Sequence, residues 1–337
     1  MTAFSALWSA VSKRVFCIAL CAILFALCPS ANAQQPKKVH RIGFLSTPSS
    51  SVISARIEAF RQGLRELGYV EGKNIAIEYR HAEGQVDRLP TLAAELVRLN
   101  LDAIVTSGPQ PVRPMREATA TIPIVFAFDD DPVGSGFVTS LARPGGNITG
   151  LSTQGAELIG KQLNLLKEII HKLSRVAILG SSTRPGTAQA FMEAQLVAPA
   201  LGVQLQYLEV ADPKDIESAF QAATQRRADA VVVLGSPLLN SHRPQIIELA
   251  SKSRLPVAYS RPEYVEDGGL MTYGANINDL FRRAATYVDK LLKGAKPVDL
   301  PVEQPKKFEF IINLKAAKQI GLTIPPNVLA RADKVIR

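Results

Sequence analysis

Arg41-Ile-Gly-Phe-Leu45 and Arg175-Val-Ala-Ile-Leu179 decide the fold, because each opens the same succession of apolar strands and amphipathic helices. The strands that follow them lie at residues 74–79, 102–105 and 122–125 in the first succession, and at 203–207, 229–232 and 255–258 in the second. Val- and Ile-rich strands that alternate with helices indicate parallel sheets covered on both faces. We therefore predict an α/β protein of two doubly wound parallel-sheet lobes, with a small-molecule cleft between them.

Three crossings between the lobes are predicted from turn-rich and proline-rich stretches. The first follows Pro144-Gly-Gly-Asn147, the second spans residues 263–267, and the third spans residues 297–305. In this scheme the N-terminal lobe comprises residues 39–150 and 268–296, and the C-terminal lobe comprises residues 151–262 and 306–337. The strand at 270–273 and the helix at 278–292 then return to the N-terminal lobe, and the strand at 308–313 joins the C-terminal lobe. Three short crossings form a hinge that permits closure.

Residues 1–33 have the pattern of a secretory signal peptide. Lys13 and Arg14 precede an uncharged apolar run at residues 15–27, and Ala31-Asn-Ala33 supplies a cleavage site. The alternative is a membrane anchor, but the apolar run covers about 20 Å as a helix, short of a hydrocarbon core of about 30 Å. We expect an exported, periplasmic protein that begins near Gln34.

All three cysteines lie within this leader. They are Cys17, Cys21 and Cys28, so the exported chain would contain none. Disulfides, thiol catalysis and cysteine metal sites are thereby excluded from it. A lipoprotein is the less favoured reading, because Leu20 and Leu27, rather than small residues, precede Cys21 and Cys28.

Composition and motifs narrow the class of function. The 39 Lys and Arg residues exceed the 30 Asp and Glu residues, but they are scattered, and no nucleic-acid recognition motif is present. Phosphate-binding Gly-rich loops, H-E-x-x-H and G-x-S-x-G are absent, and the four histidines are not spaced as metal ligands. We therefore predict no nucleic-acid partner, no catalytic residue, no metal site and no cofactor.

The candidate ligand-binding residues lie in the loops after the predicted strands. They are Ser46, Thr47, Ser107, Gly108, Asp131, Ser181, Ser236, Ser260, Arg261 and Tyr273. Hydroxyl groups, small residues and one charge of each sign suit a polar small molecule. Each residue has a structural alternative: helix capping for the serines, a turn before Pro132 for Asp131, an ion pair between the lobes for Arg261, and core packing for Tyr273.

The two charges suggest how a ligand would be oriented. Asp131 would face an ammonium group, and Arg261 or the N-terminus of the helix after Ser51 would face a carboxylate, because a desolvated ion needs a partner. The predicted ligand is a small zwitterion or carboxylate.

Several strings together resemble the ABC transporter substrate-binding protein family that is typified by the tryptophan-type binding lipoproteins. They lie at residues 41–46, 60–69, 89–96, 131–136, 141–150, 268–274 and 311–317. The resemblance spans nearly the whole chain after the leader. It implies a type I periplasmic-binding-protein fold and delivery of a small solute to a membrane permease. It also implies that Ser46, Thr47, Ser107, Gly108 and Asp131 approach the ligand.

The leading hypothesis is therefore a periplasmic, non-catalytic, monomeric solute receptor that serves an ABC permease at the inner membrane. One alternative is a secreted doubly wound enzyme, for which Asp131 would be the acid or base. The other is the ligand-sensing module of a signalling receptor, which would need an attached signalling segment.

Overall fold

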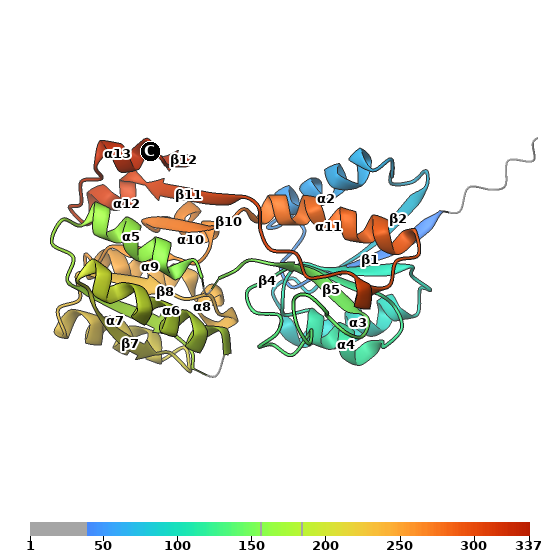
Figure 1. Cartoon of the computed structure of the whole chain (residues 1–337), viewed down its shortest axis with the longest axis horizontal. Coiled ribbons are helices and arrows are strands. Elements are labelled where there is room, and N and C mark those ends of the chain that lie inside the picture. The colour runs from blue at the N-terminus through green and yellow to red at the C-terminus, as the bar shows by residue number, and fades with distance from the viewer. Residues whose placement is uncertain (1–38, 156, 183–184) are drawn as a thin grey trace, which may run out of the picture. The chain divides into compact units, whose positions relative to one another are not determined.

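A computed structural model of the chain describes residues 39–155, 157–182 and 185–337, so the leader predicted at residues 1–33 lies outside the described residues. Within the described part, the chain forms one sheet of five strands and one of seven (Figure 1). We call the first sheet and the helices packed on it the N-terminal lobe, and the second sheet and its helices the C-terminal lobe.

The N-terminal sheet is parallel, with the strand order β2-β1-β3-β4-β5. Its strands are β1 (His40–Ser46), β2 (Ile75–His81), β3 (Ala103–Thr106), β4 (Ile124–Asp129) and β5 (Ile148–Ser152). Its helices are α2 (Ser54–Glu66), a 3-10 helix (Val86–Arg88), α3 (Leu89–Val97), α4 (Val112–Ala118), α11 (Ile277–Leu292) and a 3-10 helix (Pro297–Asp299). Figure 1 shows α11 beside α2, although more than two hundred residues separate them in the sequence.

Alternation of side chains along each strand builds a core on both faces of this sheet. Ile42 and Phe44 pack with α2 and α11 on one face, whereas Leu45 packs with α3 and α4 on the other. A strand buried on both faces must be apolar throughout. This requirement explains why the strands were recognisable in the sequence as Val- and Ile-rich runs.

The C-terminal sheet has the order β12-β11-β10-β9-β8-β6-β7. Its strands are β6 (Arg175–Gly180), β7 (Gln204–Glu209), β8 (Ala230–Val233), β9 (Val257–Tyr259), β10 (Met271–Ala275), β11 (Phe308–Asn313) and β12 (Lys334–Ile336). Its helices are α5 (Ile159–Ile169), α6 (Pro185–Leu201), α7 (Asp215–Gln225), α8 (Pro237–Ser241), α9 (Arg243–Lys252), α10 (Pro262–Glu266), α12 (Leu314–Gln319) and α13 (Pro326–Leu329). The order β7-β6-β8-β9 repeats β2-β1-β3-β4, which confirms the predicted duplication.

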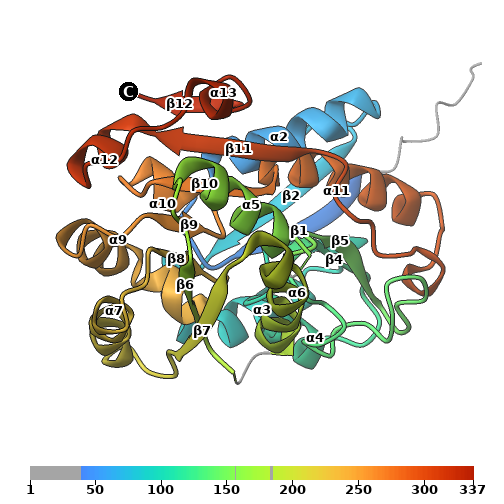
Figure 2. The ribbon, with the colours of Figure 1, turned by 60° about the vertical axis from the view of Figure 1, so that its left-hand side comes forward.

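The strand β11 runs antiparallel to β10, a departure from the predicted parallel sheet. It enters the sheet at Phe308, directly after the chain leaves the N-terminal lobe, and therefore starts at the end where β10 finishes. The strand β12, which had no signal strong enough to be predicted, then pairs in parallel with β11 (Figure 2).

The predicted second crossing at residues 263–267 is wrong, because those residues belong largely to α10, in the C-terminal lobe. Arg261 is the N-cap of this helix and Pro262 begins it, so the proline that suggested a linker starts a helix instead. The next strand, β10, pairs with β9 and β11 rather than returning to the N-terminal lobe. The chain crosses later, at Asn276 between β10 and α11.

The third crossing falls close to the predicted stretch. The backbone N–H of Val302 donates to Leu141 O and that of Glu303 donates to Gly150 O, so these residues still belong to the N-terminal lobe. The chain then reaches β11 at Phe308, which places the crossing at residues 304–307.

Candidate functional site

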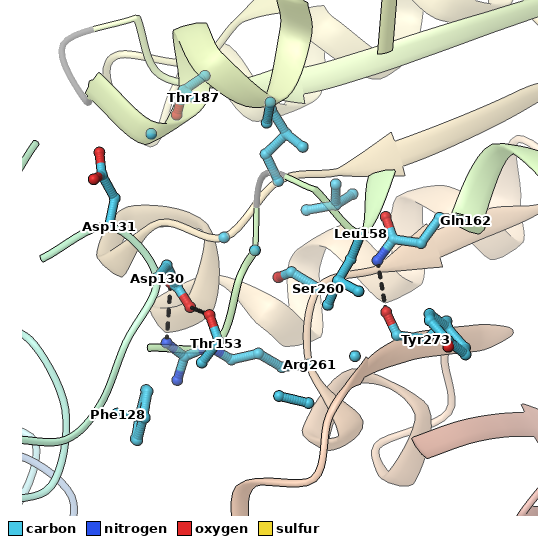
Figure 3. Close-up of a pocket in the computed structure, with 18 of the residues that line it drawn as sticks. Phe128, Asp130, Asp131, Thr153, Leu158, Gln162, Thr187, Ser260, Arg261 and Tyr273 are labelled. Carbon is cyan, nitrogen blue, oxygen red and sulfur yellow. Dashed lines mark hydrogen bonds and ion pairs between the residues drawn. The ribbon is translucent and has the colours of Figure 1, made fainter. Parts of the chain in front are cut away.

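Two adjoining cavities lie where the strand-end loops of the two lobes meet. The first is lined by the loop after β4 and by the loops after β8 and β9. We call it the acidic cavity, because Asp130, Asp131 and Arg261 are the charged side chains that line it (Figure 3). Its walls are otherwise mainly small and apolar, which suits a small ligand fixed by a few polar groups.

The second cavity has a volume of about 470 Å³, within the range of small-molecule sites. We call it the basic cavity, because three guanidinium groups line it against two carboxylates. These charged residues are Arg56, Arg243, Arg261, Glu83 and Glu263. Phe128 and Arg261 line both cavities and form the boundary between them.

Arg261 links the two lobes at this boundary. Its guanidinium carbon lies 4.9 Å from the ring centroid of Phe128, and its Nη2 lies 3.6 Å from Asp130 Oδ2. Asp130 follows β4 in the N-terminal lobe, whereas Arg261 follows β9 in the C-terminal lobe. The ion pair between lobes that the sequence left open for Arg261 is therefore present, in addition to its place in both cavities.

Asp130 is held in position by its surroundings. Thr153 Oγ1 donates a hydrogen bond of 2.8 Å to Asp130 Oδ1. A Cβ atom at Gly235, after β8, would lie 3.2 Å from Asp130 Oδ2, so glycine allows the carboxylate to approach the C-terminal lobe closely. The nearby hydroxyl of Ser260 is buried and has no hydrogen-bond partner in the described structure. A buried hydroxyl of this kind is expected to bind water or a ligand.

A second ion pair, Arg56–Glu263, joins α2 to α10 beside the basic cavity. The pKa of Arg56 is lowered to about 10, first by burial and then by the positive charge of Arg261. Arg56 is thus a desolvated cation near other cations, and the negative charge of Glu266 and the ion pair with Glu263 offset part of that repulsion.

Besides Arg261, three predicted residues line the basic cavity: Thr47, Ser107 and Gly108. The hydroxyls of Thr47 and Ser107 are buried and have no hydrogen-bond partner among the described residues. Gly108 has a φ of +134°, and a Cβ there would lie 2.8 Å from Phe128 Cζ. Only glycine fits this position without displacing the ring that Arg261 covers.

Asp131, Ser260 and Tyr273 line the acidic cavity. Asp131 also has the predicted turn role, since its Oδ1 accepts a hydrogen bond of 2.8 Å from Gly134 N. The Tyr273 ring stacks on Phe308 with centroids 6.1 Å apart, and its carbonyl accepts from Gln162 Nε2. The ring is thus packed within the C-terminal lobe.

Three predicted hydroxyls, those of Ser46, Ser181 and Ser236, line neither cavity. Ser46 Oγ lies 2.8 Å from Pro48 O and 2.6 Å from His81 Nδ1. Because it donates its one proton to the carbonyl, His81 Nδ1 must carry the proton of the second bond. Ser236 Oγ accepts from Leu239 N and caps α8, which was the stated alternative, and Ser181 is buried directly after β6.

Several residues of the cavities were not predicted. Asp130 lies in the run Asp129–Asp131. Side chains alternate between the two faces of a strand, and Asp129 ends β4 fully buried. This alternation was the signal that the side chain of Asp130 points away from that buried position. Arg56 was recognisable as a charge one residue before the inward-facing Ile57 of α2. Phe128 and Asn240 carried no signal that separated them from core and surface residues.

Two further features of the described residues concern metal binding and membrane insertion. Among residues 39–337, apart from 156, 183 and 184, no group of three or more His, Cys, Asp or Glu side chains is placed to hold a metal ion. No helix in this described part is long and apolar enough to cross a membrane.

The chain is similar to known proteins in sequence and in fold. The ABC transporter substrate binding protein family matches residues 38–336. The Tyrosine-binding protein of Clostridioides difficile strain R20291 is 23% identical over 286 residues, covering 85% of this chain and 82% of that protein. A crystal structure of a conserved domain protein from Vibrio cholerae O1 biovar El Tor is 30% identical, with a TM-score of 0.76, and covers 88% of this chain and 100% of that one.

A further structure, of an ABC domain from Streptococcus pneumoniae in complex with L-Trp, is 28% identical, with a TM-score of 0.77. It covers 88% of this chain and 99% of its own. The sequence match over nearly all described residues and the shared fold of two parallel-dominated sheets agree with the resemblance noted in the sequence. The chain belongs to the family of ABC transporter substrate-binding proteins and has the type I periplasmic-binding-protein fold.

Proposed function

We propose that this protein is an exported, monomeric receptor that captures an amino-acid-like ligand in the two adjoining cavities and delivers it to an ABC permease at the inner membrane. The observation that carries the proposal is the distribution of charge across the boundary at Phe128 and Arg261. Carboxylates predominate on one side and guanidinium groups on the other. A ligand with both an ammonium and a carboxylate group complements both sides.

The relatives support the same ligand class. One is named a tyrosine-binding protein, and another was crystallised with L-Trp. Aromatic amino acids are therefore the first ligands to test. The leader supports export, and the periplasm is where such a receptor would meet its permease.

A receptor accounts for the cavity hydroxyls better than an enzyme does. A nucleophilic serine needs a base within hydrogen-bond distance. The hydroxyls of Ser107 and Ser260 are buried without any such partner in the described structure. The absence of a base beside these two hydroxyls supports a role in ligand binding rather than in nucleophilic attack.

Ligand binding should draw the lobes together, because each cavity is lined by residues of both lobes and the chain passes between lobes in short segments. We expect the radius of gyration measured by X-ray scattering to fall when ligand is added. A tightly bound ligand that leaves the scattering curve unchanged would contradict closure.

Ligand identification tests the function directly. The protein is purified from the periplasm without refolding, and its native mass spectrum is compared with that of the denatured protein, so that a retained ligand appears as a mass difference. The twenty amino acids, several sugars and nucleosides are then screened by thermal unfolding. A ligand at a thousand times its Kd stabilises the folded state by about 4 kcal/mol, a shift of several degrees. A shift with sugars or nucleosides, and with no amino acid, would refute the proposal.

A further inference from the structure

The pair of Arg261 and Asp130 has the features of an interaction that a ligand replaces. The 3.6 Å separation of its charged atoms exceeds the 2.7–2.9 Å that is typical of a charge-assisted hydrogen bond. The carboxylate is positioned independently of the arginine, because Thr153 donates to its other oxygen. The guanidinium is likewise supported independently, because it lies over the Phe128 ring. Each partner would therefore keep its place if the other were withdrawn.

Each partner also has space for a ligand group beside it. On the side of Asp130, the acidic cavity offers the buried Ser260 hydroxyl, which lacks a hydrogen-bond partner in the described structure. On the side of Arg261, the basic cavity offers the unpartnered hydroxyls of Thr47 and Ser107. These hydroxyls can donate to a carboxylate, whereas Ser260 can accept from an ammonium group.

We propose that a zwitterionic ligand replaces the Arg261–Asp130 ion pair. Each of the two side chains then exchanges its partner in the protein for one charged group of the ligand. The ligand's ammonium group binds Asp130 beside Ser260 in the acidic cavity, and its carboxylate binds Arg261 on the side of the basic cavity. This inference rests on the proposed function and assigns the ammonium to Asp130 rather than to Asp131. The Oδ1 atom of Asp131 accepts from the backbone of its own turn, whereas Asp130 already faces a cation.

An ion pair that the ligand must replace selects for molecules that carry both charges. An amine without a carboxylate would separate the pair and leave Arg261, whose side chain is 19% exposed, without a counter-charge, and an acid without an ammonium group would do the same to Asp130, which is 25% exposed. Leaving a buried charge unpaired is strongly unfavourable. Selectivity thus arises from what the wrong ligand leaves unpaired, in addition to what the right one binds.

The test measures three related compounds by calorimetry at pH 7: L-tryptophan, its decarboxylated form tryptamine, and its deaminated form indole-3-propionate. If the wild-type protein binds a different amino acid instead, that amino acid and its own amine and acid are used. We expect the wild type to prefer the amino acid over both single-charge forms by at least about a hundredfold.

Asp130→Asn should weaken amino-acid binding by about ten- to a hundredfold and weaken the acid much less, so that preference over the acid collapses. Arg261→Gln should do the same for preference over the amine. The matched controls are Glu168→Gln and Arg331→Gln, which break an ion pair remote from both cavities and should change none of the three affinities. Thermal unfolding checks that each variant is folded.

The outcomes separate the two proposals. A wild-type protein that binds no amino acid overturns the proposed function and this inference with it. Amino-acid binding with preferences that neither variant changes overturns the inference alone, because Arg261 and Asp130 would then only join the lobes. Loss of preference through Asp131→Asn instead of Asp130→Asn would also overturn it.

Discussion

The two partners of the Arg56–Glu263 ion pair should differ in how much their removal destabilises the protein. Glu263→Gln leaves Arg56 desolvated next to Arg261 and Arg243, which share the cavity with it. Arg56→Gln leaves Glu263 in a cavity that is still lined by the guanidinium groups of Arg243 and Arg261. The loss of the carboxylate is therefore the more damaging change, although both changes break the same contact.

The magnitude follows from burial. The side chains of Arg56 and Glu263 are 15% and 21% exposed, closer to a buried pair than to a surface one. Breaking a buried pair costs about 3–5 kcal/mol, and exposed pairs contribute about 0–1 kcal/mol. We expect Glu263→Gln to lower the free energy of unfolding by about 3 kcal/mol and Arg56→Gln by about half of that.

Thermal unfolding without ligand measures the difference. At about 2 °C per kcal/mol for a chain of this size, the melting temperature should fall by about 6 °C for Glu263→Gln and about 3 °C for Arg56→Gln. The control is Glu248→Gln, which breaks an exposed pair with Lys252 and should shift the melting temperature by less than about 1 °C. Equal shifts for the two variants, or a larger one for Arg56→Gln, would refute the account of a cation crowded by other cations.

Three further outcomes are expected. Gly235→Ala puts a methyl group 3.2 Å from Asp130 Oδ2 and should weaken ligand binding in calorimetry with little loss of thermal stability; unchanged affinity would contradict the close approach. Burial lowers the pKa of His81, so the unfolded chain takes up the proton more readily and the wild type should lose stability as pH falls through about 6.5. His81→Asn should flatten that part of a plot of melting temperature against pH, and an identical slope would exclude this residue as the cause. The intact mass of the periplasmic protein should correspond to a chain that begins near Gln34, whereas a lipid adduct on Cys28 would show a lipoprotein.

The repeated architecture was predictable from the sequence because burial on both faces makes each central strand a short apolar run. The second crossing was not, because Pro262 has the same local signal at the start of a helix as in a linker. Only the pairing of β10 with β9 and β11 distinguishes the two, and that pairing depends on residues distant in the sequence.

The candidate site was predictable as a set of loops but not as a set of contacts. Thr47, Ser107 and Ser260 each follow a predicted strand, and this position was sufficient to predict that they lie near the cavities. It did not exclude Ser46, whose hydroxyl is engaged by His81 on a neighbouring strand. Asp130 was not predicted because it is distinguished by its ion pair with Arg261, which lies more than a hundred residues later in the chain.

The antiparallel pairing of β10 and β11 has a mechanical consequence. Their ladder runs up to Ala275 and Phe308, and Asn276 N extends it by donating to Lys307 O at 3.0 Å. Asn276 Nδ2 adds a bond of 3.3 Å to Glu309 Oε2. Two of the three crossings are therefore fastened side by side as one ribbon, which bends readily across its plane but resists shear and torsion. The remaining crossing, after β5, starts beside this ribbon, because Ser152 N donates to Glu303 O at 2.8 Å, so the lobes should move about essentially one axis.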